Sequence, residues 1–206
     1  MTQASTQRST IILRTISLSF FAISLGLLAW VGATLYLGKS PTGEKALIGG
    51  AFTATTHRGE QVSDKDFLGK YSLVYFGYTF CPDVCPGELQ IISAAMDLSG
   101  ETAKKITPLF FSVDPTRDTP EVLADYVPHF HDDMVGLTGT KEQMAKAAKT
   151  YRVYYAKAPD DAVPGGYLMD HSSLIYLMDP RGEYVRHFNY GTMPEEIAAA
   201  LQEIIQ

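Results

Sequence analysis

Cysteine is scarce in this sequence, whose 206 residues include only Cys81 and Cys85. A disulfide between them would close a very short loop, so it would remove little entropy from the unfolded chain and stabilise the fold little. A purely structural disulfide is therefore the weaker interpretation of the pair.

Internal repeats and low-complexity tracts are also absent after residue 38, which leaves one ordinary domain with room for a hydrophobic core.

Basic residues are too few after residue 38 to favour nucleic acid as a partner. This part of the chain carries all 23 acidic residues but lacks two of the 17 lysines and arginines, so it is more acidic than the whole chain, whose formal charge is −6. A surface of this charge repels a phosphate backbone. The sequence therefore predicts no nucleic-acid function.

Charge is missing altogether from residues 15–37, a mostly apolar run. As a helix this run would be about 34 Å long, enough for the roughly 30 Å hydrocarbon core of a membrane. Arg8 and Arg14 precede it and no acid does, so the positive-inside rule places the N-terminus in the cytoplasm. A cleaved signal peptide, with small residues at 31–33, is the alternative, although the run is long for the core of a signal.

These observations predict four segments. They are a cytoplasmic N-terminus at 1–14, a single transmembrane helix at 15–37, a short linker at 38–45 and one exported domain at 46–206. The expected location is the inner (cytoplasmic) membrane with the domain in the periplasm, or on the intermembrane-space side in a mitochondrion.

The two cysteines follow a near-continuous apolar strand predicted at 70–78. Pro86 has no backbone N–H and fits the first position of a helix, which we expect to run to Ser99. Cys81 and Cys85 are therefore expected in the loop and cap region of a helix N-terminus. Unpaired N–H groups and partial positive charge there favour thiolates, so both pKa values should lie below the free value near 8.5.

Strands and helices alternate along the rest of the domain. We expect strands at 52–56 and 61–63 (a hairpin), 106–113, 134–137, 152–158, 173–178 and 183–188, and helices at 120–130, 140–150 and from 194 to the end. A strand, a dithiol, a helix and then further strand–helix units ending in a hairpin and a helix form the thioredoxin-like order. The predicted fold class is α/β, thioredoxin-like, with a central mixed sheet flanked by helices, an N-terminal β-hairpin extension and the transmembrane helix in front.

A dithiol outside the cytoplasm becomes a disulfide unless a reductant or a metal holds it. Two thiolates suit Cu(I), and an added imidazole also permits Cu(II). His171 is the best-placed histidine, because it directly precedes the strand predicted at 173–178, and in thioredoxin-like folds the loop entering that strand faces the dithiol. His129, His131 and His187 lack such a placement.

Three motifs together resemble the signatures of the Sco (SenC) family, in the same order. They are FGYTFCPDVCP at 76–86, SVDPTRDTP at 112–120 and DHS at 170–172. The resemblance covers about residues 46–206. It implies a membrane-anchored thioredoxin-like copper protein that helps to assemble the binuclear copper centre of cytochrome c oxidase subunit II, with other copper chaperones or thiol reductants as further partners. Cys81, Cys85 and His171 match the copper ligands of the family.

Copper delivery is thus the predicted function. The protein is expected to act as a metallochaperone rather than an enzyme, passing on Cu(I) or Cu(II) by ligand exchange. The alternative is a thiol-disulfide oxidoreductase that reduces oxidase cysteines or senses redox state, in which one thiolate attacks a target disulfide and the other resolves it. Against a general reductase, the spacing is one residue longer than C-x-x-C, and the sole tryptophan is Trp30. Against a peroxidase, Tyr78 and Pro82 stand where peroxiredoxins need threonine or serine.

The middle motif admits two interpretations. Asp114, Arg117 and Asp118 either orient a ligand or dock a partner, or else Asp118 and Thr119 cap the next helix while Arg117 pairs at the surface. Met169 is soft enough to contact copper, although a core position suits a methionine equally.

Overall fold

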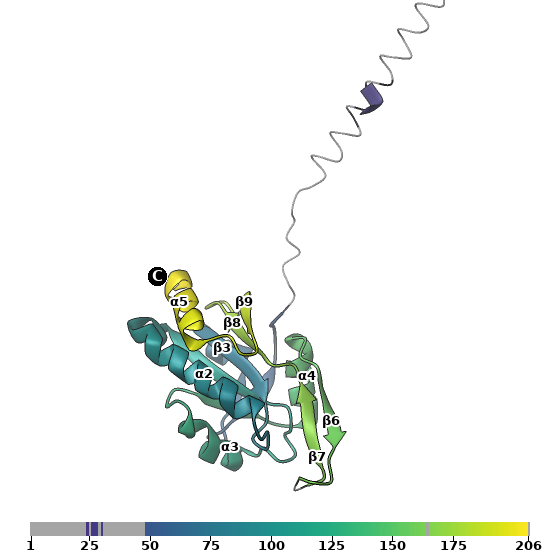
Figure 1. Ribbon diagram of the computed structural model, residues 1–206, viewed down its shortest axis with the longest axis vertical. Coiled ribbons are helices and arrows are strands. Elements are labelled where there is room, and N and C mark those ends of the chain that lie inside the picture. Colours follow the sequence, from purple (N-terminus) through teal and green to yellow (C-terminus); the bar gives the residue numbers. More distant parts are fainter. Residues whose placement is uncertain (1–23, 25, 29, 31–47, 164, 206) are drawn as a thin grey trace, which may run out of the picture. The chain divides into compact units, whose positions relative to one another are not determined.

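The structure, a computed structural model, describes residues 24, 26–28, 30, 48–163 and 165–205 (Figure 1). The chain divides into two compact units, Met1–Lys45 and Ala46–Gln206. None of the helices in the described part of the chain combines the length and the apolar composition that a membrane span requires. The segments predicted at 1–14 and 38–45 lie outside the described residues, as does the anchor predicted at 15–37 except for five positions.

A mixed sheet forms the centre of the second unit, as predicted, and it has seven strands. Its strands, in spatial order, are β2 (Gln61–Ser63), β1 (Thr53–Thr56), β5 (Val135–Thr138), β4 (Ile106–Ser112), β3 (Tyr71–Gly77), β8 (Leu174–Met178) and β9 (Tyr184–Asn189). The three middle strands β5, β4 and β3 are parallel, and the flanking strands pair antiparallel. The predicted hairpin β1–β2 extends the sheet beyond β5.

The helices that cover the sheet are α2 (Val84–Ser99), α3 (Pro120–Tyr126), α4 (Lys141–Thr150) and α5 (Pro194–Ile204), and short 3-10 turns lie at Asp64–Phe67, Gly100–Lys105 and Val127–His129. Three of these four helices, α3, α4 and α5, begin where the sequence indicated. The side chains of Thr119 and Thr140 accept hydrogen bonds from the first turns of α3 and α4. Helices α2 and α5 lie side by side over one face of the sheet (Figure 1).

The helix predicted at 120–130 is shorter than expected. It ends as an α-helix at Tyr126 and continues only as the 3-10 turn Val127–His129. Pro128 accounts for the change, because it has no N–H to donate in an i→i−4 hydrogen bond.

The core is densest around β3, the strand that leads to the dithiol. Its residues from Leu73 to Phe76 are at most 1% exposed, because helices cover one face of the strand and aromatic side chains of β4 pack beside it. Phe76 stacks on Phe111 with ring centroids 4.8 Å apart. This packing gives the cysteine loop a rigid base.

One strand was not predicted. Tyr167–His171 forms β7, which pairs antiparallel with β6 (Tyr155–Pro159) in a two-stranded sheet separate from the main one. The prediction of a loop at His171 is therefore wrong, because this residue ends a strand. Gly165 and Gly166, both at positive φ, end the connection that leads into β7.

Candidate functional site

The dithiol lies where β3 gives way to α2. Cys81 is partly buried in the connecting loop, and Cys85 is completely buried in the first turn of the helix. The helix begins at Val84, two residues earlier than predicted, so Pro86 is its third residue. Proline is tolerated there because the first four N–H groups of a helix have no partner within it. Both cysteines are free thiols.

Gly77, the last residue of β3, leaves room for the buried sulfur. A Cβ atom at this position would lie 2.9 Å from the Sγ atom of Cys85 and 3.0 Å from the rings of Tyr75 and Phe110. Because real Cβ atoms do not approach so closely, only glycine lets Cys85 pack against the end of the strand.

The environment of the two sulfurs makes them unequal. The Cys85 N–H donates to the Cys81 Sγ atom at 3.3 Å. A hydrogen bond from the Cys85 thiol holds the pKa of Cys81 well below its usual value, with further support from His171 and against the cost of burial. The same hydrogen bond, together with burial and the charge on Cys81, raises the pKa of Cys85, so the prediction that both pKa values are lowered is wrong for this residue. The pair therefore shares one proton, with Cys81 as the thiolate.

The imidazole of His171 faces Cys85. Its Nε2 atom lies 3.2 Å from the Cys85 Sγ atom, and its Nδ1 atom lies 3.1 Å from the carbonyl oxygen of Ser172. A carbonyl only accepts hydrogen bonds, so Nδ1 carries a proton and Nε2 is the ring nitrogen that faces the sulfur. The imidazole packs edge-on against the rings of Tyr75 and Tyr78, with centroids 6.1 and 5.9 Å away, which fixes its orientation.

The three residues predicted as ligands thus lie in one cluster. Two ligands on one ion, bonded at 2.0–2.3 Å with a tetrahedral angle, lie about 3.5 Å apart, and the sulfur–nitrogen distance between Cys85 and His171 is 3.2 Å. Among the residues that the structure describes, no group of three or more His, Cys, Asp or Glu side chains is already set in a metal-binding arrangement. The donors present, two sulfurs and an imidazole nitrogen, are of the types that bind copper.

An open cavity of about 280 Å³ gives access to the cluster. It is lined by Cys81 and His171 and by residues of the cysteine loop and of β7. Met169 also contributes to its wall but is only 6% exposed and belongs to the core. A ligand from another protein can therefore reach Cys81 and His171, whereas Cys85 is completely buried.

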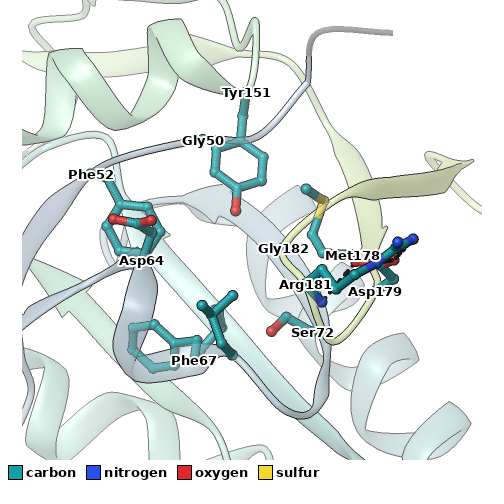
Figure 2. A pocket seen from close by; sticks show the side chains of 12 residues that line it. Gly50, Phe52, Asp64, Phe67, Ser72, Tyr151, Met178, Asp179, Arg181 and Gly182 are labelled. Atoms are coloured by element: carbon teal, nitrogen blue, oxygen red, sulfur yellow. Dashed lines mark hydrogen bonds and ion pairs between the residues drawn. The ribbon is translucent and has the colours of Figure 1, made fainter. Parts of the chain in front are cut away.

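A second cavity, of about 120 Å³, lies near the other end of β3, beside Ser72 (Figure 2). Figure 2 shows the Tyr151 hydroxyl pointing into it, and Phe52, Phe67 and Met178 contribute to its lining. None of the predicted site residues lines this cavity. The length of a seven-residue strand, about 20 Å, separates it from the dithiol.

The buried members of the middle motif tie the cysteine loop to β4. Asp118 is completely buried and accepts hydrogen bonds from the Thr79 N–H at 3.1 Å, the Thr79 hydroxyl at 2.6 Å and the Ser112 hydroxyl at 2.6 Å. Thr119, rather than Asp118, caps the following helix. Surface pairing is also wrong for Arg117, whose side chain is 12% exposed and binds the carboxylate of Asp114.

Sequence reasoning placed Glu88 in the first turn of a helix but did not predict its burial. The residue is 1% exposed and lies one turn after Cys85 in α2. One carboxylate oxygen accepts a hydrogen bond from the Gly191 N–H at 3.1 Å, and the other is buried without a partner. Burial raises the pKa of Glu88.

We expect Glu88→Gln to increase the free energy of unfolding of the metal-free chain at neutral pH. With its pKa raised, the folded state holds the Glu88 proton more tightly than the unfolded state does. The stability from the protonated group is present below the ordinary glutamate pKa of about 4.3 and is lost as the pH rises through the folded-state pKa. Glutamine keeps an acceptor for Gly191 without a charge to desolvate, a gain of about 1 kcal/mol.

Urea unfolding at about pH 5 and about pH 7.5 measures this effect, which should be larger at the higher pH. Glu101→Gln, at an exposed glutamate, is the matched control. A Glu88→Gln chain less stable than the wild type at the higher pH would show that the carboxylate is stabilising instead.

Comparison with known proteins supplies the context of this site. Residues 40–206 match the family model described as SCO1/SenC. The chain is 46% identical over 159 residues to the human protein named "Protein SCO1 homolog, mitochondrial", a match that covers 76% of this chain and 52% of the human protein. It is 44% identical over 161 residues to "Protein SenC" of Rhodobacter capsulatus, covering 78% of this chain and 72% of that protein. The chain thus spans about half the length of its human relative.

A solved structure is similar over the same region. The copper-bound ScoI of Bradyrhizobium japonicum superimposes with a TM-score of 0.70 at 46% sequence identity, over 76% of this chain and 98% of that one. Homologous Sco structures therefore exist with copper bound. The family match extends over the whole described domain, including both cysteines and His171. The chain belongs to the SCO1/SenC family.

Proposed function

We propose that the domain at 46–206 binds one copper ion through Cys81, Cys85 and His171 and delivers it to the binuclear copper centre of cytochrome c oxidase subunit II during assembly. The observation that carries the proposal is the 3.2 Å approach of the His171 Nε2 atom to the Cys85 Sγ atom, beside a free Cys81. Membership of the SCO1/SenC family and the copper in a relative 46% identical support the choice of metal.

The difference in accessibility between the two cysteines suits copper delivery. Cys81, the thiolate that borders the open cavity, is the ligand that an incoming cysteine or histidine of the partner replaces first. Cys85 is completely buried and holds the ion until the exchange is complete. Two sulfurs are enough for Cu(I), and the imidazole of His171 adds the nitrogen donor that Cu(II) favours.

The proposed topology keeps this domain outside the cytoplasm. Residues 1–14 stay inside, residues 15–37 anchor the chain in the inner membrane, and residues 38–45 link the anchor to the domain. The uncharged apolar run and the two arginines before it support this arrangement. On this proposal, the domain lies in the compartment outside the cytoplasm, where it passes copper to the oxidase subunit.

Thiol-disulfide exchange is the second candidate. It is favoured by the lowered pKa of Cys81, which makes that residue an attacking thiolate. Cys85, buried and protonated, would then resolve the mixed disulfide. This activity is compatible with copper delivery if its substrate is the pair of oxidase cysteines that must be reduced before they bind metal.

Deletion of the gene separates the two candidates. We expect cells without the protein to lose the activity of the copper-containing cytochrome oxidase, most severely when copper is scarce, because added copper bypasses a delivery step by mass action. The measurement is oxidase activity in membranes from cells grown over a range of copper concentrations. Oxidase loss that copper cannot relieve, together with oxidised thiols in several exported proteins, would instead favour the reductase.

A further inference from the structure

The hairpin β6–β7, which carries His171, has no strand partner in the main sheet. Its two strands pair only with each other (Figure 1). An isolated two-stranded hairpin is marginally stable in water, so side-chain contacts must hold it in place. Two hydrogen bonds between Tyr154 and Ser172 secure its base, on the side of His171. The other end of β7, at Tyr167, needs a separate attachment.

Arg117 provides that attachment. Its Nη1 atom donates to the carbonyl oxygen of Tyr167 at 3.0 Å, and its guanidinium stacks on the Tyr167 ring, 3.9 Å from the centroid. Its Nε atom donates to the carboxylate of Asp114, which also accepts from the Tyr167 hydroxyl at 3.0 and 3.1 Å. The three side chains form a closed ring of contacts between the loop after β4 and the start of β7.

The same guanidinium reaches the cysteine loop. It lies 4.7 Å from the ring centroid of Phe80, the residue before Cys81, and 5.7 Å from that of Tyr78. Side chains alternate along a strand, so Tyr167 and His171 share one face of β7. A side chain that clamps Tyr167 against Phe80 therefore also sets the distance between His171 and the cysteines.

We propose that Arg117 is a positioning residue that clamps the β7 strand to the cysteine loop and thereby determines whether the imidazole of His171 joins the two sulfurs on the metal. This inference rests on the proposed copper site. With the clamp closed, the site offers sulfur and nitrogen together, which suits Cu(II). With the clamp released, it offers the two thiolates alone, which still satisfy Cu(I).

The test compares Arg117→Met and Arg117→Lys with the wild type, using the full chain. Methionine keeps an apolar stem of similar length, whereas lysine keeps the charge but loses the planar stack and the forked hydrogen bonds. Arg186→Met is the matched control, because Arg186 also stacks on an aromatic ring, that of Phe188, but lies on β9, an edge strand of the main sheet. The readouts are the dissociation constants for Cu(I) and Cu(II), the thiolate-to-Cu(II) absorption band, and hydrogen exchange of the metal-free chain.

Both Arg117 variants should bind Cu(II) about 10–100-fold more weakly, the usual cost of losing a group that orients a metal ligand. Cu(I) affinity should stay near the wild-type value, the absorption band should shift, and the amides of β7 should exchange faster while those of β3 stay protected. Arg186→Met should match the wild type in all readouts. If Arg117→Met does not fold, Arg117→Lys supplies the same measurements.

Two results would overturn the clamp. One is a folded variant with unchanged Cu(II) affinity and unchanged exchange in β7. The other is an equal loss of Cu(I) and Cu(II) binding together with faster exchange across β3, which would show that Arg117 supports the whole fold. If the wild-type chain itself binds no copper, the proposed function fails, and the exchange of β7 alone then decides whether Arg117 holds the hairpin.

Discussion

Replacing either cysteine with serine is expected to abolish stoichiometric Cu(I) binding. The serine hydroxyl is a hard, protonated group, and one remaining thiolate with one imidazole is a poor cage for a soft ion. The loss should exceed the roughly 10–100-fold cost of removing a group that only orients a ligand. Anaerobic competition with a coloured Cu(I) chelator measures it for Cys81→Ser and Cys85→Ser.

The two cysteine variants should differ in thermal stability. Cys81 borders the open cavity, so serine there removes the accessible ligand without changing the core. Cys85 is completely buried against Gly77, so serine there also leaves a hydroxyl in the core. The Cys85→Ser variant should therefore have the lower thermal stability of the two. Stoichiometric Cu(I) binding by either variant would remove that cysteine from the proposed site.

His171→Ala is expected to weaken the binding of Cu(II) much more than the binding of Cu(I). Cu(II) affinity should fall steeply because the nitrogen donor is lost, whereas Cu(I) should remain bound by the two sulfurs. Titration with each ion under matched conditions measures the split. His187→Ala is the control, because His187 lies on the exposed β9 strand, where its Nδ1 atom pairs with the Tyr184 hydroxyl. Equal losses of Cu(I) and Cu(II) would contradict this division between sulfur and nitrogen.

The same variant separates delivery from thiol exchange in cells. Imidazole serves the metal but is not required when two thiols exchange with a disulfide. A strain with His171→Ala should therefore fail to assemble active oxidase when copper is limiting, while the purified variant still reduces a model disulfide. Normal oxidase levels in that strain at limiting copper would refute the delivery function.

The sequence predicted those parts of the fold that depend on local patterns. The apolar run of β3 and the capping threonines Thr119 and Thr140 act within one element, and each lies where it was expected. The start of α2 was misplaced because Pro86 is compatible with several positions in a first turn. Strand β7 was missed because apolar Leu168, between Tyr167 and Met169, breaks the apolar–polar alternation of a half-buried strand.

The surroundings of the site were harder to predict because they depend on contacts between distant parts of the chain. Arg117 and Tyr167 are 50 residues apart, and Glu88 meets Gly191 across 103 residues. A charged residue after a strand is usually a surface residue, and only the folded hairpin reveals that Arg117 is enclosed. His171 was predicted to face the dithiol because fold order alone places it there, whereas the orientation of its ring depends on Tyr75 and Tyr78.

The most direct test of the copper site is the metal and thiol content of the chain after anaerobic loading with Cu(I) and removal of excess metal. The proposed site predicts one copper per chain, with both Cys81 and Cys85 protected from alkylation until a chelator removes the ion. It would be contradicted by a chain that retains no copper, or by one whose two cysteines remain freely alkylated with copper bound.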